Sequence, residues 1–161
     1  MVEINVVNVD AGVNNQVMIG QAGFIKTAED LYEALMGTST VIKFGLAFSE
    51  ASGPCLIRTE GNDIELQGIA ERNASALGAG HTFIVVFKNA FPINVNNAVK
   101  GVPEVVNIFC STANSVQVVV AETDQGRGVL GVIDGYPPKG TEGPADKAKR
   151  KKLLRDLGYK M

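Results

Sequence analysis

The sequence of 161 residues contains a single histidine, His81, and only two cysteines. Cys55 and Cys110 stand far apart and show neither a C-x-x-C motif nor a Cys/His ligand spacing. A zinc site is therefore not expected, and small buried thiols in a reducing compartment are the simpler interpretation. A disulfide stays open if the host is a hyperthermophile. Because no second histidine exists to share an ion, we predict no metal site at His81.

Long apolar segments are also missing. No apolar run reaches the ~18 residues that a membrane helix needs. The N-terminal stretch MVEINVVNVD alternates polar and apolar residues and lacks the basic and then apolar layout of a signal peptide. These absences predict a cytoplasmic protein without a membrane partner.

Nucleotide-binding signatures are the third absence. The Walker A pattern G-x-x-x-x-G-K-[ST] does not occur, and no G-x-G-x-x-G follows a strand and opens a helix. The string GRGVLG (126–131) fits the second pattern by letter only, because it begins a strand between two β-type runs. A doubly wound dinucleotide-binding domain is therefore not expected.

Charge is divided unevenly along the chain. Residues 1–146 carry 8 basic and 16 acidic side chains, whereas residues 147–161 carry 7 basic and 1 acidic. An acidic body would repel a phosphate backbone, so we predict no nucleic-acid partner for it. The basic tail alone could bind RNA. Its leucines, Leu153, Leu154 and Leu157, favour instead a surface helix that docks to the body or to a neighbouring subunit.

Periodicity and turn residues predict six or seven strands and three or four helices. The expected strands are 3–9, 40–50, 55–60, 81–87, 104–111, 115–122 and 128–134. The expected helices are 27–37, 62–78, a short one within 91–103, and a basic one over about 144–158. Residues 10–27 are rich in Gly and Asn and are expected to be mostly loop.

These elements predict how the sheet is assembled. Residues 40–50 and 55–60 should form a hairpin, and the continuous β-branched and aromatic run 81–87 should be a central strand. The last three strands are joined by loops too short for helices, which predicts an antiparallel meander. Thr27 and Asn62 are the expected N-caps of the first two helices. The expected fold is a single α+β domain with a mixed, largely antiparallel sheet.

Polar side chains gather where the expected strands end. They are Lys43, Ser49, Glu50, Arg58, Glu60, Asp63, Asp134, Tyr136 and Lys139. Each also has an ordinary interpretation. Glu60 and Asp63 suit the start of a helix, Asp134 before a glycine is a common turn residue, and Lys43 fits the solvated face of a strand.

His81 follows the string GAG, in which Gly78 and Gly80 stand at the end of the second helix. Such a turn leaves backbone N–H groups uncovered by side chains and suits close approach of a phosphate. Imidazole is a nucleophile near neutral pH and can carry a phosphoryl group. The ordinary alternative is a core histidine with both ring nitrogens hydrogen-bonded, and spacing alone favours that alternative.

The direction of the strands constrains any site at His81. His81 begins its strand, whereas Glu50 and Asp134 end theirs. They meet at one edge of the sheet only if strand 81–87 runs opposite to strands 40–50 and 128–134, which a mixed sheet permits.

Four long strings of the sequence resemble the adenosine-specific kinases, a small family found mainly in archaea and some thermophilic bacteria. The strings are KFGLAFSEASGPCLIRTEGND, GAGHTFIVVF, AFPINVNNAVKGVPEVVNIFC and AETDQGRGVLGVIDGYPPKGTE. The resemblance extends from residue 1 to about residue 157. It implies that residues 1–161 form one domain that binds adenosine or AMP, that His81 carries a phosphohistidine, and that the protein is a homo-oligomer, a trimer or a multiple of it.

With this resemblance, the phosphoryl carrier is favoured over the core histidine. The implied activity is that of a phosphotransferase that works in two steps through His81. Lys43, Arg58 or Lys139 would neutralise the phosphate charge, together with the backbone around Gly78 and Gly80. ATP is the candidate phosphate donor and Mg²⁺ a candidate ion.

The remaining candidate residues would serve the imidazole and the nucleoside. Ser49 lies on the same small-residue turn as Glu50. Glu50, Glu60 or Asp134 would orient the ring, bind Mg²⁺ or accept hydrogen bonds from the ribose hydroxyls. Phe48 or Tyr136 would stack on adenine. The alternative function is a non-catalytic nucleotide-sensing module that carries the same phosphohistidine without turnover.

Overall fold

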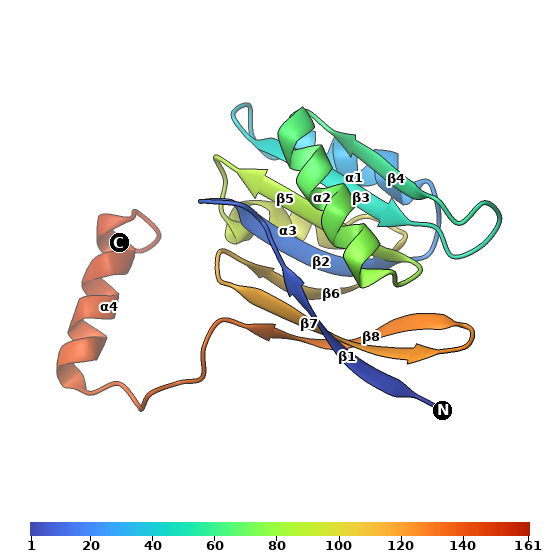
Figure 1. Ribbon diagram of the computed structural model, residues 1–161. Helices are drawn as coiled ribbons and strands as arrows, with labels where there is room; N and C mark the ends of the chain where they lie inside the picture. Colours follow the sequence, from blue (N-terminus) through green and yellow to red (C-terminus); the bar gives the residue numbers. More distant parts are fainter.

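Eight strands form two antiparallel sheets in the computed structural model, which describes residues 1–161 (Figure 1). The strands are β1 (Glu3–Val9), β2 (Gln16–Ala22), β3 (Lys43–Ser49), β4 (Ile57–Gly61), β5 (Thr82–Lys88), β6 (Val105–Thr112), β7 (Val116–Thr123) and β8 (Gly126–Asp134). The larger sheet has the order β4-β3-β5-β2-β6 and the smaller one β1-β7-β8. The α+β class is thus confirmed, with eight strands divided between two sheets.

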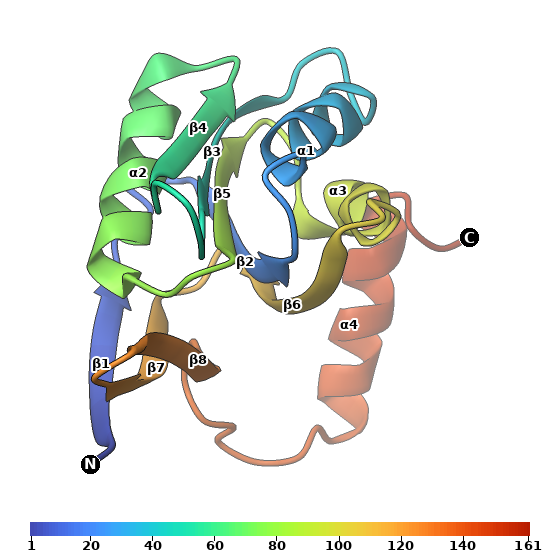
Figure 2. The same ribbon diagram turned by 90° about the vertical axis from the view of Figure 1, so that its right-hand side faces the viewer.

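Four helices complete the chain. They are α1 (Thr27–Met36), α2 (Ile64–Leu77), α3 (Pro92–Lys100) and α4 (Pro144–Asp156). Helices α1 and α3 cover one face of the five-stranded sheet, while α2 and the three-stranded sheet lie against the other face (Figure 2). None of the four helices combines the length and the apolar character that crossing a bilayer would require.

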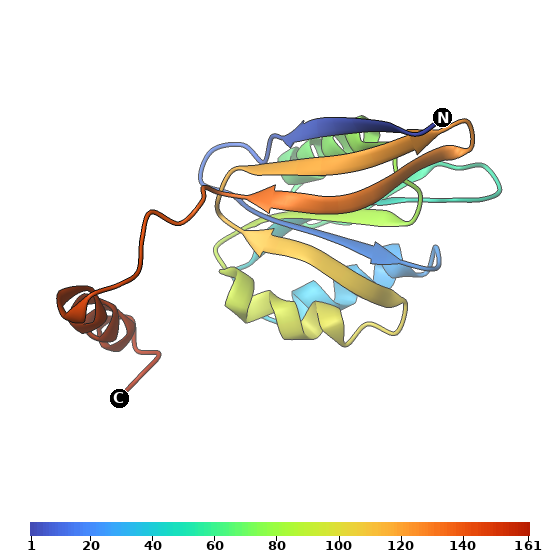
Figure 3. The same cartoon turned by 90° about the horizontal axis from the view of Figure 1, so that it is seen from below.

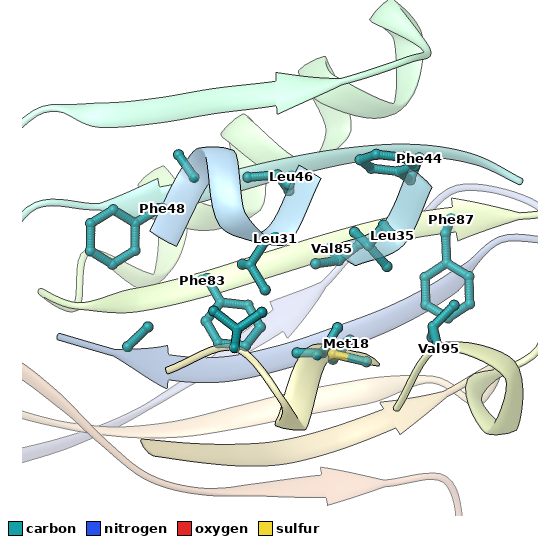
Figure 4. Close-up of a cluster of buried hydrophobic side chains, with 14 of the residues drawn as sticks. Met18, Leu31, Leu35, Phe44, Leu46, Phe48, Phe83, Val85, Phe87 and Val95 are labelled. Carbon is teal, nitrogen blue, oxygen red and sulfur yellow. The ribbon is translucent and has the colours of Figure 1, made fainter. Parts of the chain in front are cut away.

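Alternation along β3 and β5 builds a core on each face of the large sheet. One set of strand side chains packs against Leu31 and Leu35 of α1 and against α3 (Figure 4), and includes Phe44, Leu46, Phe48, Phe83, Val85 and Phe87. The intervening residues, such as Ile84 and Val86, pack against α2 and the small sheet. Because β5 is buried on both faces, its continuous apolar sequence is explained and its predicted central position is confirmed.

Strand β2 lies within the stretch that the sequence predicts as mostly loop, and that prediction is wrong. β2 pairs with β5 on one side and β6 on the other, so it is an interior strand. Gly20 breaks its apolar pattern. A Cβ at Gly20 would lie 2.3 Å from Cζ of Phe83, so the glycine makes room for that ring. Gly20, which weakens the strand pattern in the sequence, is therefore needed for the packing of β2 against Phe83.

Strands β6, β7 and β8 do not form the predicted meander. β6 pairs with β2 in the large sheet, whereas β7 pairs with both β1 and β8 in the small sheet. The predicted hairpin of β3 and β4 is confirmed. The expectation of two buried thiols holds for Cys110, whose pKa burial raises to about 11, but Cys55 is exposed.

The two predicted helix caps also differ in the structure. Thr27 is buried inside the first turn of α1, which has no side-chain cap. Asp63 caps α2 by accepting a hydrogen bond from the N–H of Leu66. Asn62 instead accepts from the N–H of Phe44 and donates to the C=O of Ile42, which fixes the start of β3.

Helix α4 forms where the sequence predicts it but stands apart from the rest of the molecule (Figure 1). None of its residues is buried. Residues 135–143 connect it to β8 without regular structure. The predicted docking of its leucines to the body of the same chain is therefore absent.

Gly45 sets the distance between α2 and the large sheet, and we predict that Gly45→Ala destabilises the fold. A Cβ at Gly45 would lie 2.0 Å from the backbone N of Gln67 and 2.2 Å from the carbonyl carbon of Leu66, neither of which can move alone. Overpacking against backbone should lower the free energy of unfolding by roughly 3 kcal/mol. Urea denaturation measures the loss. Gly140→Ala, which meets no atom within 4 Å, is the matched control. Equal midpoints for both variants would contradict the prediction.

Candidate functional site

The backbone of His81 joins two strands at the start of β5. Its N–H donates to the C=O of Ser49 at 2.8 Å, and its C=O accepts from the N–H of Ala22 at 2.9 Å. These bonds connect β5 to the end of β3 and to the end of β2. The antiparallel arrangement of β3 and β5 that a shared site at Glu50 requires is thereby confirmed.

His81 adopts a left-handed backbone conformation, with φ of 61°. A residue with a Cβ pays roughly 1–2 kcal/mol to occupy this region, which glycine enters freely. The chain places glycine at Gly78 and Gly80 nearby but not here. Asn14, Cys55 and Asn89 are the other non-glycine residues with a positive φ.

The imidazole of His81 lies over the ring of Phe48, with centroids 5.9 Å apart and an interplanar angle of 19°. Phe48 is fully buried beneath it, so the predicted stacking of adenine on Phe48 is not supported by its position. His81 itself is partly exposed, and no side chain or backbone group of the protein hydrogen-bonds to its ring nitrogens. It is not the core histidine with two satisfied nitrogens that spacing alone favours.

A cleft of about 310 Å³ opens beside this ring. One wall is the turn between β2 and α1, formed by Gly23, Phe24 and Ile25. The other wall is the loop between β3 and β4, residues 50–54, and the floor is made by Phe48 and His81. The volume lies at the lower end of the range for small-molecule sites. An apolar wall beside a nucleophilic ring suits a flat, mostly apolar group such as a nucleobase.

The loop between β3 and β4 is held by the carboxylate of Glu50. Its Oε2 accepts from the N–H of Leu56 at 2.7 Å and its Oε1 from Nη2 of Arg58 at 2.8 Å. The Leu56 N–H and then the Arg58 guanidinium lower the pKa of Glu50 below its ordinary value. Glu50 is therefore ionised at neutral pH, and Arg58 brings a positive charge to this loop.

One electrostatic feature of the cleft favours a negative group. Gly23, Phe24 and Ile25 lead directly into α1, so the positive end of the α1 dipole lies at the cleft wall. The N–H groups of Thr27 and Ala28 are already bonded to the carbonyls of Phe24 and Ile25. The charge of Glu50, which lines the cleft, is balanced by its ion pair with Arg58.

The GAG turn is only partly available as the phosphate cradle that the sequence predicts. Within the turn, the N–H of Gly78 donates to the C=O of Ala74 and ends α2. The N–H groups of His81 and Thr82, which follow the turn, donate to the carbonyls of Ser49 and Ala79 and start β5. A phosphate cradle formed by the N–H groups of Ala79 and Gly80 stays a prediction.

A second cleft of about 560 Å³ lies on the other side of Gly80. Four glycines line it, Gly78, Gly80, Gly126 and Gly128, together with Arg127. The Arg127 guanidinium is occupied, because it bonds Glu122 and the carbonyls of Ala76 and Leu77 at the C-terminal end of α2. That helix end carries negative partial charge. The second cleft is therefore a poorer place for phosphate than the cleft at His81.

Three of the remaining predicted residues lie near His81, whereas a fourth, Glu60, lies farther along β4. Glu50 lines the His81 cleft, and Arg58 bonds to Glu50. Ser49 is buried and accepts the His81 N–H through its carbonyl. Glu60 lies two residues beyond Arg58 on β4, opposite Leu46.

The other predicted residues lie away from His81 within one chain. Lys43 begins β3 and pairs with Lys88, at the opposite end of the strand from Ser49. Asp134 ends β8 and accepts a hydrogen bond from Asn114. It is the start of β8, at Arg127, that adjoins the turn before β5. Tyr136 and Lys139 follow Asp134 and are exposed. The strand-direction condition thus holds for β3 but not for β8, which belongs to the other sheet.

Sequence reasoning missed the apolar wall of the cleft. Phe24 is 57% exposed and Ile25 is 43% exposed, although both are large and apolar. The signal available was an aromatic and aliphatic pair between a glycine and a helix start, in a stretch interpreted as loop. No group of three or more His, Cys, Asp or Glu side chains is placed to hold a metal ion.

Comparison with known proteins finds a protein family and similar solved structures. The sequence profile of the family described as "Adenosine specific kinase" matches residues 7–160. The crystal structure of the PH1918 protein from Pyrococcus horikoshii OT3 is similar over 100% of this chain and 99% of that chain, with 43% sequence identity and a TM-score of 0.96. No curated protein matches the sequence.

The hydrogen bonds of Glu50 predict a pH-dependent loop. Because its pKa is lowered in the folded protein, the carboxylate stabilises the loop above its ordinary pKa of 4.5, and this stabilisation is lost as the pH falls through the lowered value. Protection of the Leu56 amide against hydrogen exchange should therefore fall at low pH. Glu50→Ala should show severalfold lower protection already at pH 7. Glu71→Ala, an exposed change on α2, is the control, and equal protection in both variants would refute the prediction.

Proposed function

The chain belongs to the adenosine specific kinase family, and we propose that it is a phosphotransferase that binds adenosine or AMP and carries a phosphoryl group on His81. The observation that carries this proposal is the only histidine of the chain, held in a left-handed conformation with its ring open to a cleft. The family supplies the substrate class, and the geometry at His81 supplies the nucleophile.

The proposed reaction has two steps. In the first, a ring nitrogen of His81 attacks the terminal phosphorus of the donor, for which ATP is the candidate. The N–P bond forms as the P–O bond to the leaving ADP breaks. In the second, a hydroxyl oxygen of the acceptor nucleoside attacks the same phosphorus. The N–P bond breaks, and the hydroxyl proton is taken up by the freed imidazole.

The surroundings of His81 support a role in such a transfer. Phe48 fixes the plane of the ring from below, so that the nucleophile is positioned before substrate arrives. The dipole of α1, whose N-terminal end lies at the cleft wall, favours the charge of the phosphoryl group. The Glu50 carboxylate is already engaged with Leu56 and Arg58, so Mg²⁺ would enter with the phosphates of the nucleotide rather than through a protein cluster.

The apolar wall of the cleft supports recognition of a base. Phe24 and Ile25 are exposed at the side of the cleft that faces the loop of Glu50. A purine ring could cover this apolar surface while its ribose points toward His81. Adenine offers less polar edge to such a wall than guanine does, which is consistent with an adenosine substrate.

Phosphorylation of His81 is the first prediction of this proposal. Incubation with ATP and Mg²⁺ should add one phosphate per chain, removed by mild acid and stable to alkali, because protonation makes the ring nitrogen a good leaving group. Intact mass before and after acid measures it. His81→Gln should fold but take up no phosphate. If His81→Gln keeps both phosphate uptake and turnover, the mechanism is wrong.

A steady-state assay on the same protein separates the two functions. A phosphotransferase should convert many molecules of adenosine per chain, whereas a sensing module would stop after one phosphate. If phosphate transfer stops after one phosphate per chain although the phosphohistidine forms normally, the protein is a sensing module and not an enzyme.

Base recognition by Phe24 is the second prediction. Calorimetry should show binding of adenosine and AMP in preference to GMP. Phe24→Ala should weaken AMP binding roughly tenfold, since stacking of a base on an aromatic ring contributes about 1–3 kcal/mol. Phe91→Ala removes an equally exposed aromatic ring before α3 and is the matched control. Equal affinities for AMP and GMP, or equal losses in both variants, would contradict this role.

A further inference from the structure

The second cleft, of about 560 Å³, is larger than the cleft at His81 but has no part in the reaction proposed above. It lies between the turn that joins β7 to β8 and the loop that joins β3 to β4, which reach the same end of the molecule (Figure 3). A backbone bridge between Ala79 and Arg127 joins β8 to the turn before β5 at this place. The volume is within the range of small-molecule sites, so its lining decides which ligand it suits.

The guanidinium of Arg127 is held in the second cleft by its edges. Its Nε donates to Oε2 of Glu122 at 3.0 Å, its Nη2 lies 3.0 Å from the same oxygen, and its Nη1 donates to the carbonyls of Ala76 and Leu77 at 3.2 and 3.4 Å. Hydrogen bonds to a guanidinium lie in its plane, so these partners leave its flat faces for stacking. The side chain is 31% exposed and lines the cleft. A fixed guanidinium plane is a surface on which nucleobases stack.

Gln125, in the turn between β7 and β8, brings an unengaged amide to the same cleft. Its backbone N–H donates to Oγ1 of Thr123 at 3.3 Å, whereas its side-chain amide makes no hydrogen bond within the chain. A glutamine amide offers a donor and an acceptor side by side, which matches N6 and N7 of adenine. Guanine presents two acceptors, O6 and N7, at the corresponding edge and pairs with only one of these groups. The lining therefore favours adenine over guanine.

Gly128 keeps part of this cleft free of side chains. A Cβ at Gly128 would meet no atom within 4 Å, so internal packing does not require a glycine at this place in β8. Its partner on β7 is Ala121, another small residue of the cleft lining. Glycine weakens the interior of a strand and can mark a place where a ligand approaches the backbone closely. This side of the cleft is thus open to a flat ring lying against β8.

We propose that the second cleft binds the adenosine part of the phosphate donor ATP, an inference that rests on the phosphoryl transfer proposed for His81. The adenine ring stacks on Arg127, and its edge faces the amide of Gln125. The two clefts adjoin at Ala51, which lines both, and Gly80 lies against it, because a Cβ at Gly80 would come 2.9 Å from Cβ of Ala51. The phosphates extend over these two small residues toward the imidazole, away from the negative C-terminal end of α2. The acceptor nucleoside keeps the cleft at His81.

Calorimetry with ATP tests the second cleft separately from the chemistry, when every variant also carries His81→Gln so that no phosphate is transferred. Gly128→Leu fills the cleft and should raise the Kd for ATP roughly tenfold, because the base can no longer stack. Gly131→Leu, a change at an equally open position of β8 outside the cleft, is the matched control and should bind ATP normally. Gln125→Ala should reduce the preference for ATP over GTP. Equal affinities of the two leucine variants for ATP, or no binding of ATP at all, would overturn the proposal.

The thiol of Cys55 reports directly whether the second cleft is occupied. Cys55 lines this cleft and is exposed, whereas Cys110 is buried. ATP should slow the reaction of Cys55 with N-ethylmaleimide, followed by intact mass, and this protection should persist in Phe24→Ala but disappear in Gly128→Leu. If Phe24→Ala alone removes the protection, both nucleotides share the cleft at His81 and the proposal is wrong. If ATP protects Cys55 while His81 takes up no phosphate, the proposed chemistry fails and the ATP site is supported.

Discussion

The burial of β5 on both faces is the constraint on which the rest of the structure depends. β5 pairs with β2 and β3, and its side chains alternate between the layer of α1 and α3 and the layer of α2 and the small sheet. Its first connection to both neighbours is made by the backbone of His81. The backbone of His81 is therefore held between two strands, while its imidazole lies over the buried ring of Phe48 and lines the cleft.

Much of this arrangement can be predicted from local sequence. The apolar run of β5, the hairpin of β3 and β4 and the helices that end at glycine all leave clear signals over a few residues. β2 escapes prediction because Gly20 serves the ring of Phe83, a contact between residues far apart in the chain. The transfer of β7 to a different sheet from β6 depends on pairing with β1, which no local pattern encodes.

The residues of the candidate site also fall into those that local sequence predicts and those that it does not. His81 and Glu50 can be found from the sequence because both stand at the ends of strands that prove to be antiparallel neighbours. Asp134 cannot be assigned correctly, because its strand lies in the other sheet and the start of that strand, not its end, adjoins the turn before His81. Phe24 carries only a weak local signal, an aromatic residue between a glycine and a helix start, and its place beside the cleft follows from the position of β2. Local sequence identifies reactive residues, and topology decides which of them meet.

The main chain and the side chain of His81 have separate roles, and this separation determines how modification of the ring would affect the fold. The main chain supplies the hydrogen bonds to Ser49 and Ala22, while the ring contributes only its contact with Phe48. Adding or removing a group at a ring nitrogen changes neither of the bonds that hold the strands. A reaction cycle at this residue would proceed on a rigid platform, without mechanical work on the sheet and without a refolding penalty at each turnover.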